Sequence, residues 1–271
     1  MTALSLRRLV AAVTLVGCLG IVGCSASGPS GETDAASTPD RQGGAGLSGE
    51  LTIFAAASLS GAFDQLAADF EEQHPGVDVR PISYDGSSVL AVQLIEGAAA
   101  DVFAAADEKN MTKVVDAGLA VEPESFASNV LQIAVAPGNP ESIDSLAALA
   151  SDGLAVVLCA PEVPCGTAAR ALLDDAGIEL RPASEEQNVT AVLSKVKSGE
   201  ADAGLVYRTD VAAAAGDVTG VDIAGAERAT NVYPLSALRD AANPTAATAF
   251  VAFVLSESGQ RVLAEYGFGA P

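Results

Sequence analysis

The chain has 271 residues and a formal net charge of −21, from 35 acidic and 14 basic residues. Nucleic acid and anionic membrane surfaces are poor partners for so acidic a protein, because like charges repel. The sequence holds one histidine, His74, and no C-x-x-C pair. Its composition therefore also argues against a Cys/His metal site.

The N-terminus resembles an export signal. Arg7 and Arg8 precede an apolar run over residues 9–23, which is too short for a confident membrane span. Ile21-Val-Gly-Cys24 matches the bacterial lipoprotein cleavage signal. We therefore predict a signal peptide at residues 1–23, lipid attachment at Cys24 and a disordered tether at residues 24–49. The alternative is a plain signal peptide with an incidental cysteine.

The rest of the chain alternates short apolar runs with helical patterns. This alternation predicts an α/β fold with mainly parallel sheets, in which ligands bind at the carboxyl ends of strands. The expected strands cover residues 52–55, 77–84, 101–106, 130–136, 154–159, 203–207, 218–224 and 231–237. The expected helices cover the apolar patterns at residues 62–70, 90–95, 111–115, 142–150, 168–173, 189–196, 244–254 and 259–266, with a short Ala-rich helix starting at residue 209.

Small and hydroxyl-bearing residues stand where expected strands meet expected helices. The first strand runs through Ala55–Ala57 to Ser58, just before a helix with an apolar face. The second strand is followed by Asp85-Gly-Ser-Ser88 and another helical pattern. Such turns outline an anion site at helix N-termini. The alternative is that Ser58 or Ser60 only caps its helix.

Cys159 and Cys165 are the cysteines left outside the signal region. They are six positions apart in a turn that also contains Pro161 and Pro164. Since the protein is expected to be exported to an oxidising compartment, a disulfide between them is predicted. Two buried free thiols are the alternative.

No sequence motif points to catalysis. His74 lies in a His-Pro-Gly turn, and there is no G-x-S-x-G, P-loop or G-x-G-x-x-G motif. We therefore expect a binding protein that is not an enzyme and needs no cofactor. A structural or adhesive envelope lipoprotein and a hydrolase remain the less favoured alternatives.

Several motifs in order along residues 51–268 carry a resemblance to a known family. They are Phe54-Ala-Ala-Ala-Ser-Leu59, Gly86-Ser-Ser88, Ala100-Asp-Val-Phe-Ala-Ala-Ala-Asp107, Pro161-Glu-Val-Pro-Cys-Gly166, Gly204-Leu-Val-Tyr207 and Tyr266-Gly-Phe268. Together they resemble the molybdate-binding proteins of the ModA type. These are the substrate-binding components of ABC importers that take up molybdate and often tungstate.

The resemblance implies a two-lobed periplasmic-binding-protein fold of type II, with the ion between the lobes. Lobe 1 would hold residues 50–129 and 232–271, and lobe 2 residues 130–231. A monomer, anchored to the outer side of the membrane, would deliver the ion to an ABC permease.

The resemblance also implies the ligand-binding residues. By motif they are Ser58, Ser87, Cys165, Val189 and Tyr207, with Cys165 and Val189 acting through their backbone N–H groups. Ser88 is a neighbour that could take the place of Ser87.

These positions contain only hydrogen-bond donors, which suits an unprotonated tetrahedral dianion. Sulfate has the same charge and shape, so it is the alternative ligand. Because none of the five donors titrates near neutral pH, binding is expected to change little between about pH 6 and 8.

Overall fold

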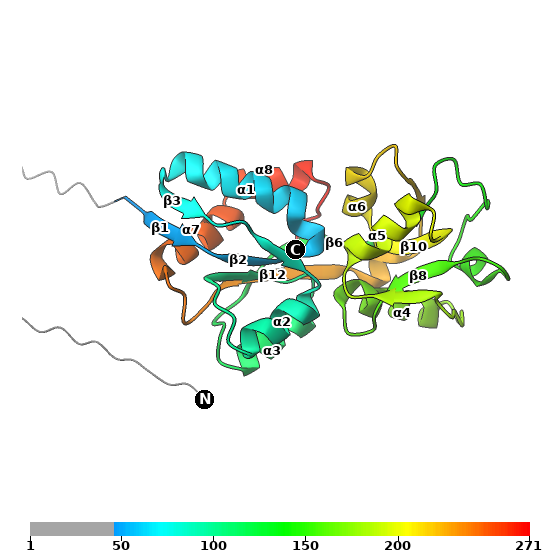
Figure 1. Cartoon of the computed structure of the whole chain (residues 1–271), viewed down its shortest axis with the longest axis horizontal. Coiled ribbons are helices and arrows are strands. Elements are labelled where there is room, and N and C mark those ends of the chain that lie inside the picture. Colours follow the sequence, from blue (N-terminus) through cyan, green and yellow to red (C-terminus); the bar gives the residue numbers. More distant parts are fainter. Residues whose placement is uncertain (1–45) are drawn as a thin grey trace, which may run out of the picture. The chain divides into compact units, whose positions relative to one another are not determined.

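The computed structural model describes residues 46–271 (Figure 1). The predicted signal peptide, the predicted lipidation site Cys24 and most of the predicted tether lie outside the described residues. Among the described residues, no helix has the length and apolar character needed to span a membrane.

The described chain is built on two five-stranded sheets, and each sheet forms the centre of one lobe. Lobe 1 contains the sheet with strand order β4-β2-β5-β12-β6, and lobe 2 the sheet β11-β7-β10-β8-β9. In lobe 1 the strands are β2 (Ile53–Ala56), β4 (Ser83–Asp85), β5 (Val102–Ala104), β6 (Glu124–Asn129) and β12 (Asn231–Ala237). In lobe 2 they are β7 (Leu131–Val135), β8 (Val156–Cys159), β9 (Ser184–Glu186), β10 (Ala203–Tyr207) and β11 (Thr219–Asp222).

Four strands of each sheet run in one direction and one runs in the other. The reversed strand is β12 in lobe 1, which pairs antiparallel with β5 and β6. In lobe 2 it is β7, which pairs antiparallel with β10 and β11. The remaining pairs, β2 with β4 and β5, and β8 with β9 and β10, are parallel. This confirms the predicted α/β class with mainly parallel sheets.

The sheet of lobe 1 is covered by helices on both faces (Figure 1). Along β2 and β5 alternate side chains point to opposite faces, so Ile53 packs with one core and Phe54 with the other. The first core lies under α1 (Ser60–Gln73), α7 (Pro244–Leu255) and α8 (Glu257–Glu265). The second lies under α2 (Ser87–Ile95) and α3 (Glu108–Asp116).

The apolar face expected on the first helix is the one that α1 buries. Its buried residues are Ala62, Phe63, Leu66, Ala67 and Phe70. They recur at the helical period and form one stripe, as expected for a helix that packs on a sheet.

Lobe 2 has one continuous core. The strands β7, β8 and β10 are almost fully buried. Helices α4 (Pro164–Asp175) and α5 (Val189–Ser198) cover them, and the short α6 (Arg208–Ala213) follows β10 directly. The 3-10 turns η1 (Ala57–Leu59), η2 (Ala147–Ala150) and η3 (Ala226–Ala229) complete the elements.

Three strands were not expected from the sequence. β1 (Ser48–Leu51) pairs with β3 (Gly76–Val79) in a separate two-stranded sheet, so it begins inside the range predicted for the tether. β6 and β9 are edge strands of mixed polarity. Edge strands need no continuous apolar run, because their outer side has no partner strand.

One expected strand is divided in the structure. The range 77–84 forms β3 and β4, which belong to different sheets and are separated by residues 80–82. Pro81 lies in this break. It has no N–H to donate to a strand partner, which explains why the ladder stops there.

The chain passes between the lobes twice. The first passage is at Val130, between β6 and β7, and the second is at Thr230, between η3 and β12. Next to these passages the Asn129 Nδ2 atom of lobe 1 donates a hydrogen bond of 2.8 Å to Thr209 Oγ1 of lobe 2.

Candidate functional site

A small pocket lies between the two lobes. It has a cavity volume of about 10 Å³, which is far below the size of a site for a drug-sized organic ligand. Both lobes line it, and all five residues expected to bind the ligand are among its lining. The lining residues are Ala56, Ala57, Ser58, Asp85, Gly86, Ser87, Ala106, Val163, Pro164, Cys165, Asn188, Val189 and Tyr207.

Ser58 reaches the pocket from the 3-10 turn that follows β2. Its Oγ atom lies 3.0 Å from Tyr233 Oη, and Tyr233 is fully buried on β12. Neither η1 nor α1 has a side-chain cap, so the alternative that Ser58 or Ser60 caps the helix is wrong. When Tyr233 donates to Ser58, the Ser58 hydroxyl is left with its proton to donate into the pocket.

Ser87 is the first residue of α2 and is almost fully buried. Its Oγ accepts a hydrogen bond of 2.9 Å from the backbone N–H of Ala106. A hydroxyl that accepts one bond still has a proton to donate. The neighbouring Ser88 is buried and its Oγ has no partner among the described residues, but it does not line the pocket.

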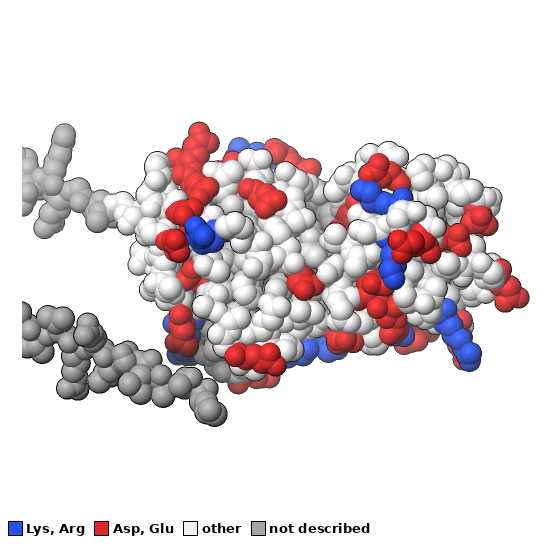
Figure 2. All heavy atoms as spheres, viewed as in Figure 1, with Lys and Arg blue, Asp and Glu red and all other residues white. Residues whose placement is uncertain are grey.

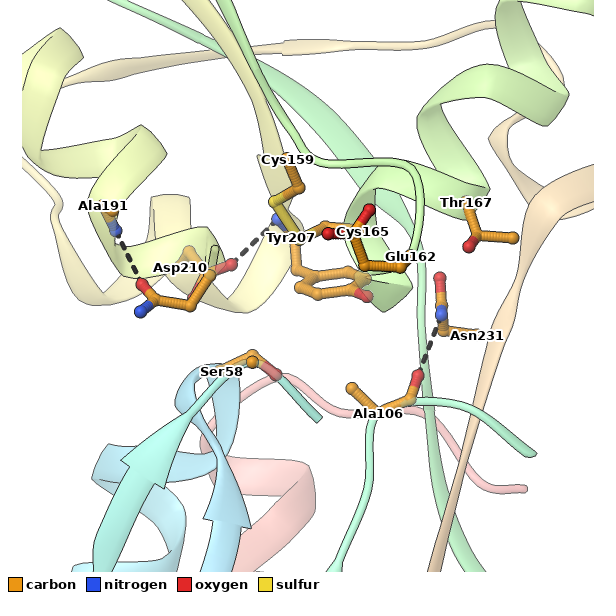
Figure 3. The surroundings of a disulfide bond; sticks show 12 residues. Ser58, Ala106, Cys159, Glu162, Cys165, Thr167, Ala191, Tyr207, Asp210 and Asn231 are labelled. Atoms are coloured by element: carbon orange, nitrogen blue, oxygen red, sulfur yellow. Dashed lines mark hydrogen bonds between the residues drawn. A yellow bond between two sulfur atoms is a disulfide. The ribbon is translucent and has the colours of Figure 1, made fainter. Parts of the chain in front are cut away.

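Cys165 lies in the first turn of α4, where backbone N–H groups have no acceptor within the helix. A disulfide joins Cys165 to Cys159 at the end of β8, with the two Cα atoms 5.7 Å apart (Figure 3). The next residue, Gly166, lies against the carbonyl of Ala160 so closely that a Cβ atom there would collide with it. The turn is thus held by both a covalent bond and close backbone packing.

Val189 is the first residue of α5, and its side chain is buried in the core of lobe 2. Asn188 caps this helix, since its side chain accepts a hydrogen bond of 2.9 Å from the Ala191 N–H. The cap satisfies one free donor of the first turn and leaves the Val189 N–H unused by the helix.

Tyr207 ends β10 and is almost fully buried, with its ring beside the Cys159–Cys165 disulfide (Figure 3). Its Oη atom is buried and has no hydrogen-bond partner among the described residues. A buried hydroxyl without a partner costs stability. An acceptor in the pocket would satisfy it.

Asp210 lies in the first turn of α6 and contacts the backbone of Tyr207. Its carboxylate accepts a hydrogen bond of 2.9 Å from the Tyr207 N–H. Burial of the carboxyl raises the pKa of Asp210 to about 7, although this hydrogen bond acts in the opposite direction. Asp210 is therefore a titrating group that the expectation of pH-independent binding left out.

The pocket combines helix N-termini, which favour an anion, with a lining that has no cationic side chain among the described residues. No Lys, Arg or His is among the described residues that line it. The N-termini of α2, α4 and α5 all border it, and each carries the positive end of a helix dipole. Acidic side chains are scattered over the face of both lobes seen in Figure 2, so the attraction is local to the pocket.

Four residues around the pocket were missed by the sequence prediction. Tyr233 supports Ser58, Asp210 supports Tyr207, and Asp85 and Asn188 line the pocket themselves. Only Asn188 carried a local signal, because it precedes an apolar helical pattern as an N-cap does. Asp85 belongs to the predicted Asp85-Gly-Ser-Ser88 turn but was not named as a site residue, and Tyr233 and Asp210 meet the site through tertiary contacts, which have no local pattern.

Comparisons with known proteins place the chain in a family. Residues 51–269 match the model of the bacterial extracellular solute-binding proteins. The chain is 44% identical to the molybdate-binding protein ModA of Mycobacterium tuberculosis over 257 residues, covering 93% of this chain and 94% of that relative.

Solved structures agree with this match. The substrate-binding domain of a putative molybdenum ABC transporter from Clostridium difficile is 28% identical, with a TM-score of 0.61, covering 82% of this chain and 99% of that one. The periplasmic molybdate-binding protein of Azotobacter vinelandii is 23% identical, with a TM-score of 0.72, covering 82% of this chain and 99% of that one. At this identity the match supports the similarity of the fold and nothing further. The chain therefore belongs to the bacterial extracellular solute-binding protein family and, within it, to the ModA-type proteins.

Proposed function

We propose that this protein captures molybdate, and tungstate as well, outside the cytoplasm and delivers the ion to an ABC transporter permease. The observation that carries the proposal is that five donor positions from distant parts of the chain line one small pocket. They are Ser58, Ser87, Cys165, Val189 and Tyr207.

The chemistry of the donors fits such an ion. Molybdate and tungstate are dianions without a proton near neutral pH, so they only accept hydrogen bonds. The hydroxyls of Ser58, Ser87 and Tyr207 and the backbone N–H groups of Cys165 and Val189 only need to donate. Each bond to a charged group is worth about 1.5–3 kcal/mol, which together exceeds an association cost of about 4 kcal/mol.

The proposal includes a passive role in transport. The protein would bind the ion without changing it and would need no cofactor. It would act as a monomer held to the membrane by a lipid on Cys24, with residues 25–45 as the tether. The lipid and the tether rest on the sequence of residues 1–45, whereas the passive role rests on the absence of catalytic motifs and on the family. Mass spectrometry of the mature N-terminus tests the lipid.

A calorimetric titration of the soluble 25–271 form tests the ligand. Molybdate and tungstate should bind tightly at one site, and sulfate and phosphate should bind at least tenfold more weakly. Tight binding of sulfate alone would replace molybdate by the alternative ligand. No heat with any of the four anions would contradict the proposal and favour a structural envelope lipoprotein.

A further inference from the structure

Two turns meet across the pocket, one from each lobe. Asp85 ends β4 in lobe 1, and Asn188 precedes α5 in lobe 2. The Asn188 Nδ2 atom donates a hydrogen bond of 2.8 Å to Asp85 Oδ1. Both residues line the pocket and are half-buried.

The backbones of the two turns also touch. Gly86 follows Asp85, and a Cβ atom at Gly86 would collide with the carbonyl oxygen of Gln187 in lobe 2. Only a glycine lets the lobes approach this far at that point. The Asp85–Asn188 bond is therefore part of a close contact between the lobes.

Both side chains are held by their own lobes. Asp85 Oδ1 also accepts a hydrogen bond of 2.7 Å from the Gly86 N–H, while Asn188 Oδ1 accepts from the Ala191 N–H of α5. The amide of Asn188 thus joins the start of α5, next to the Val189 N–H, to the start of α2, next to Ser87.

We propose that Asp85 and Asn188 form a latch that holds the lobes closed over the bound ion and slows its release. This rests on the proposed function, since it needs an ion in the pocket. Asp85 would be a positioning residue that acts through Asn188 on the Val189 donor. The loss of a hydrogen bond between the lobes is expected mainly in the dissociation rate.

A carboxylate beside an anion site also has an electrostatic cost, because it repels the ligand. The two N–H donors on Asp85 Oδ1 offset this cost. The charge and the hydrogen bond of Asp85 therefore act in opposite directions on ligand affinity, and substitutions can separate them.

Stopped-flow measurement of molybdate association and dissociation tests the latch. Asp85→Ala removes the bond, and Asn188→Ser keeps a capping hydroxyl for α5 but has no amide to donate to Asp85. Each should release molybdate about tenfold faster, with an association rate changed less than about threefold. Asp85→Asn keeps an acceptor at the Oδ1 position without the charge, so its release should stay within about threefold of the wild type.

The exposed Asp144, which does not line the pocket, gives a matched control as Asp144→Ala. Thermal unfolding without ligand shows whether each variant is folded. The double variant Asp85→Ala, Asn188→Ser should release no faster than the singles, because the bond is already absent.

An unchanged release rate in Asp85→Ala would overturn the latch while leaving molybdate binding in place. Release from Asp85→Asn as fast as from Asp85→Ala would also overturn it, since charge would then matter and the bond would not. If the wild type binds no oxyanion, the proposed function itself fails, which is a distinct result.

Discussion

The two lobes contribute to the pocket in different ways. Lobe 1 contributes side-chain hydroxyls, Ser58 and Ser87, each with a second polar partner in its own lobe. Lobe 2 borders the pocket with the starts of α4 and α5, whose first N–H groups are the proposed donors, together with Tyr207. A side-chain donor depends on residue type, whereas a backbone donor depends on the position of the helix. The lobes should therefore respond differently to substitution.

The largest effect is expected in lobe 1. Ser58→Ala and Ser87→Ala each remove one donor to a charged ligand, at a cost of about 1.5–3 kcal/mol, or roughly tenfold to a hundredfold in Kd. Titration calorimetry with molybdate measures the loss. The exposed Ser151→Ala is the control, and its Kd should not change.

The matching substitution in lobe 2 should do little. Val189→Ala keeps the backbone N–H, so the Kd for molybdate should stay within about threefold of the wild type. Some stability should be lost because Val189 is buried. A loss of affinity as large as that of Ser87→Ala would contradict the distinction between the lobes.

Tyr207 is the exception within lobe 2, because its proposed contact with the ion is made by its side chain, whose buried Oη has no partner among the described residues. Tyr207→Phe should weaken molybdate binding about tenfold. The free protein should melt at the same temperature or higher, since the removed hydroxyl has no partner among the described residues. Thermal melting with and without molybdate measures both effects, and a destabilised free protein would show that Tyr207 Oη has a structural partner.

Removal of the Cys159–Cys165 disulfide tests whether the Cys165 N–H must be held in place before the ion binds. Cys159→Ser together with Cys165→Ser should cost little stability, because the bridged loop is short. Molybdate should be released a few times faster, since the Cys165 N–H must then be ordered on binding. Equal release rates would reject this role of the bond, and thiol counting that finds two free cysteines in the native protein would reject the bond itself.

Asp210 should make both the stability of the protein and its affinity for molybdate depend on pH. Its folded-state pKa is about 7 against an ordinary value of 3.8. Between about pH 4 and 7 the folded state keeps a proton that the unfolded state has lost, so the free energy of unfolding falls as the pH rises. A bound dianion also favours the protonated carboxyl, so molybdate affinity should fall as the pH rises through about 7.

Asp210→Asn separates this effect from the other titrating groups. The amide can still accept the Tyr207 N–H but does not ionise. The difference between wild type and variant in unfolding free energy should therefore appear above pH 4 and grow toward pH 7, whereas the difference in Kd should appear only as the pH rises through about 7. Parallel pH profiles would show that Asp210 does not titrate in this range.

Much of the fold was predictable because it has local signals. The alternation of buried strands and helices gave the α/β class, and the buried face of α1 follows the helical period. The edge strands β6 and β9 lacked an apolar run and were missed. The division of residues 77–84 between two sheets depends on tertiary pairing that no local pattern carries.

The residues of the candidate site also fall into those with a local sequence signal and those without one. Ser58 and Ser87 stand out in the sequence because hydroxyls at strand ends are a chemical signal. Val189 is an apolar core residue by every local measure, and only family resemblance singled it out. Asp85 was named only as part of a turn and not as a site residue, and its partner Asn188 lies 103 positions away in the sequence.

A crystal structure with tungstate, located by its anomalous scattering, tests the central claim most directly. The account predicts one strong peak between the lobes, with oxygens within hydrogen-bond distance of Ser58 Oγ, Ser87 Oγ, Tyr207 Oη and the backbone nitrogens of Cys165 and Val189. A peak elsewhere, or an ion held by a Lys or Arg side chain, would contradict it.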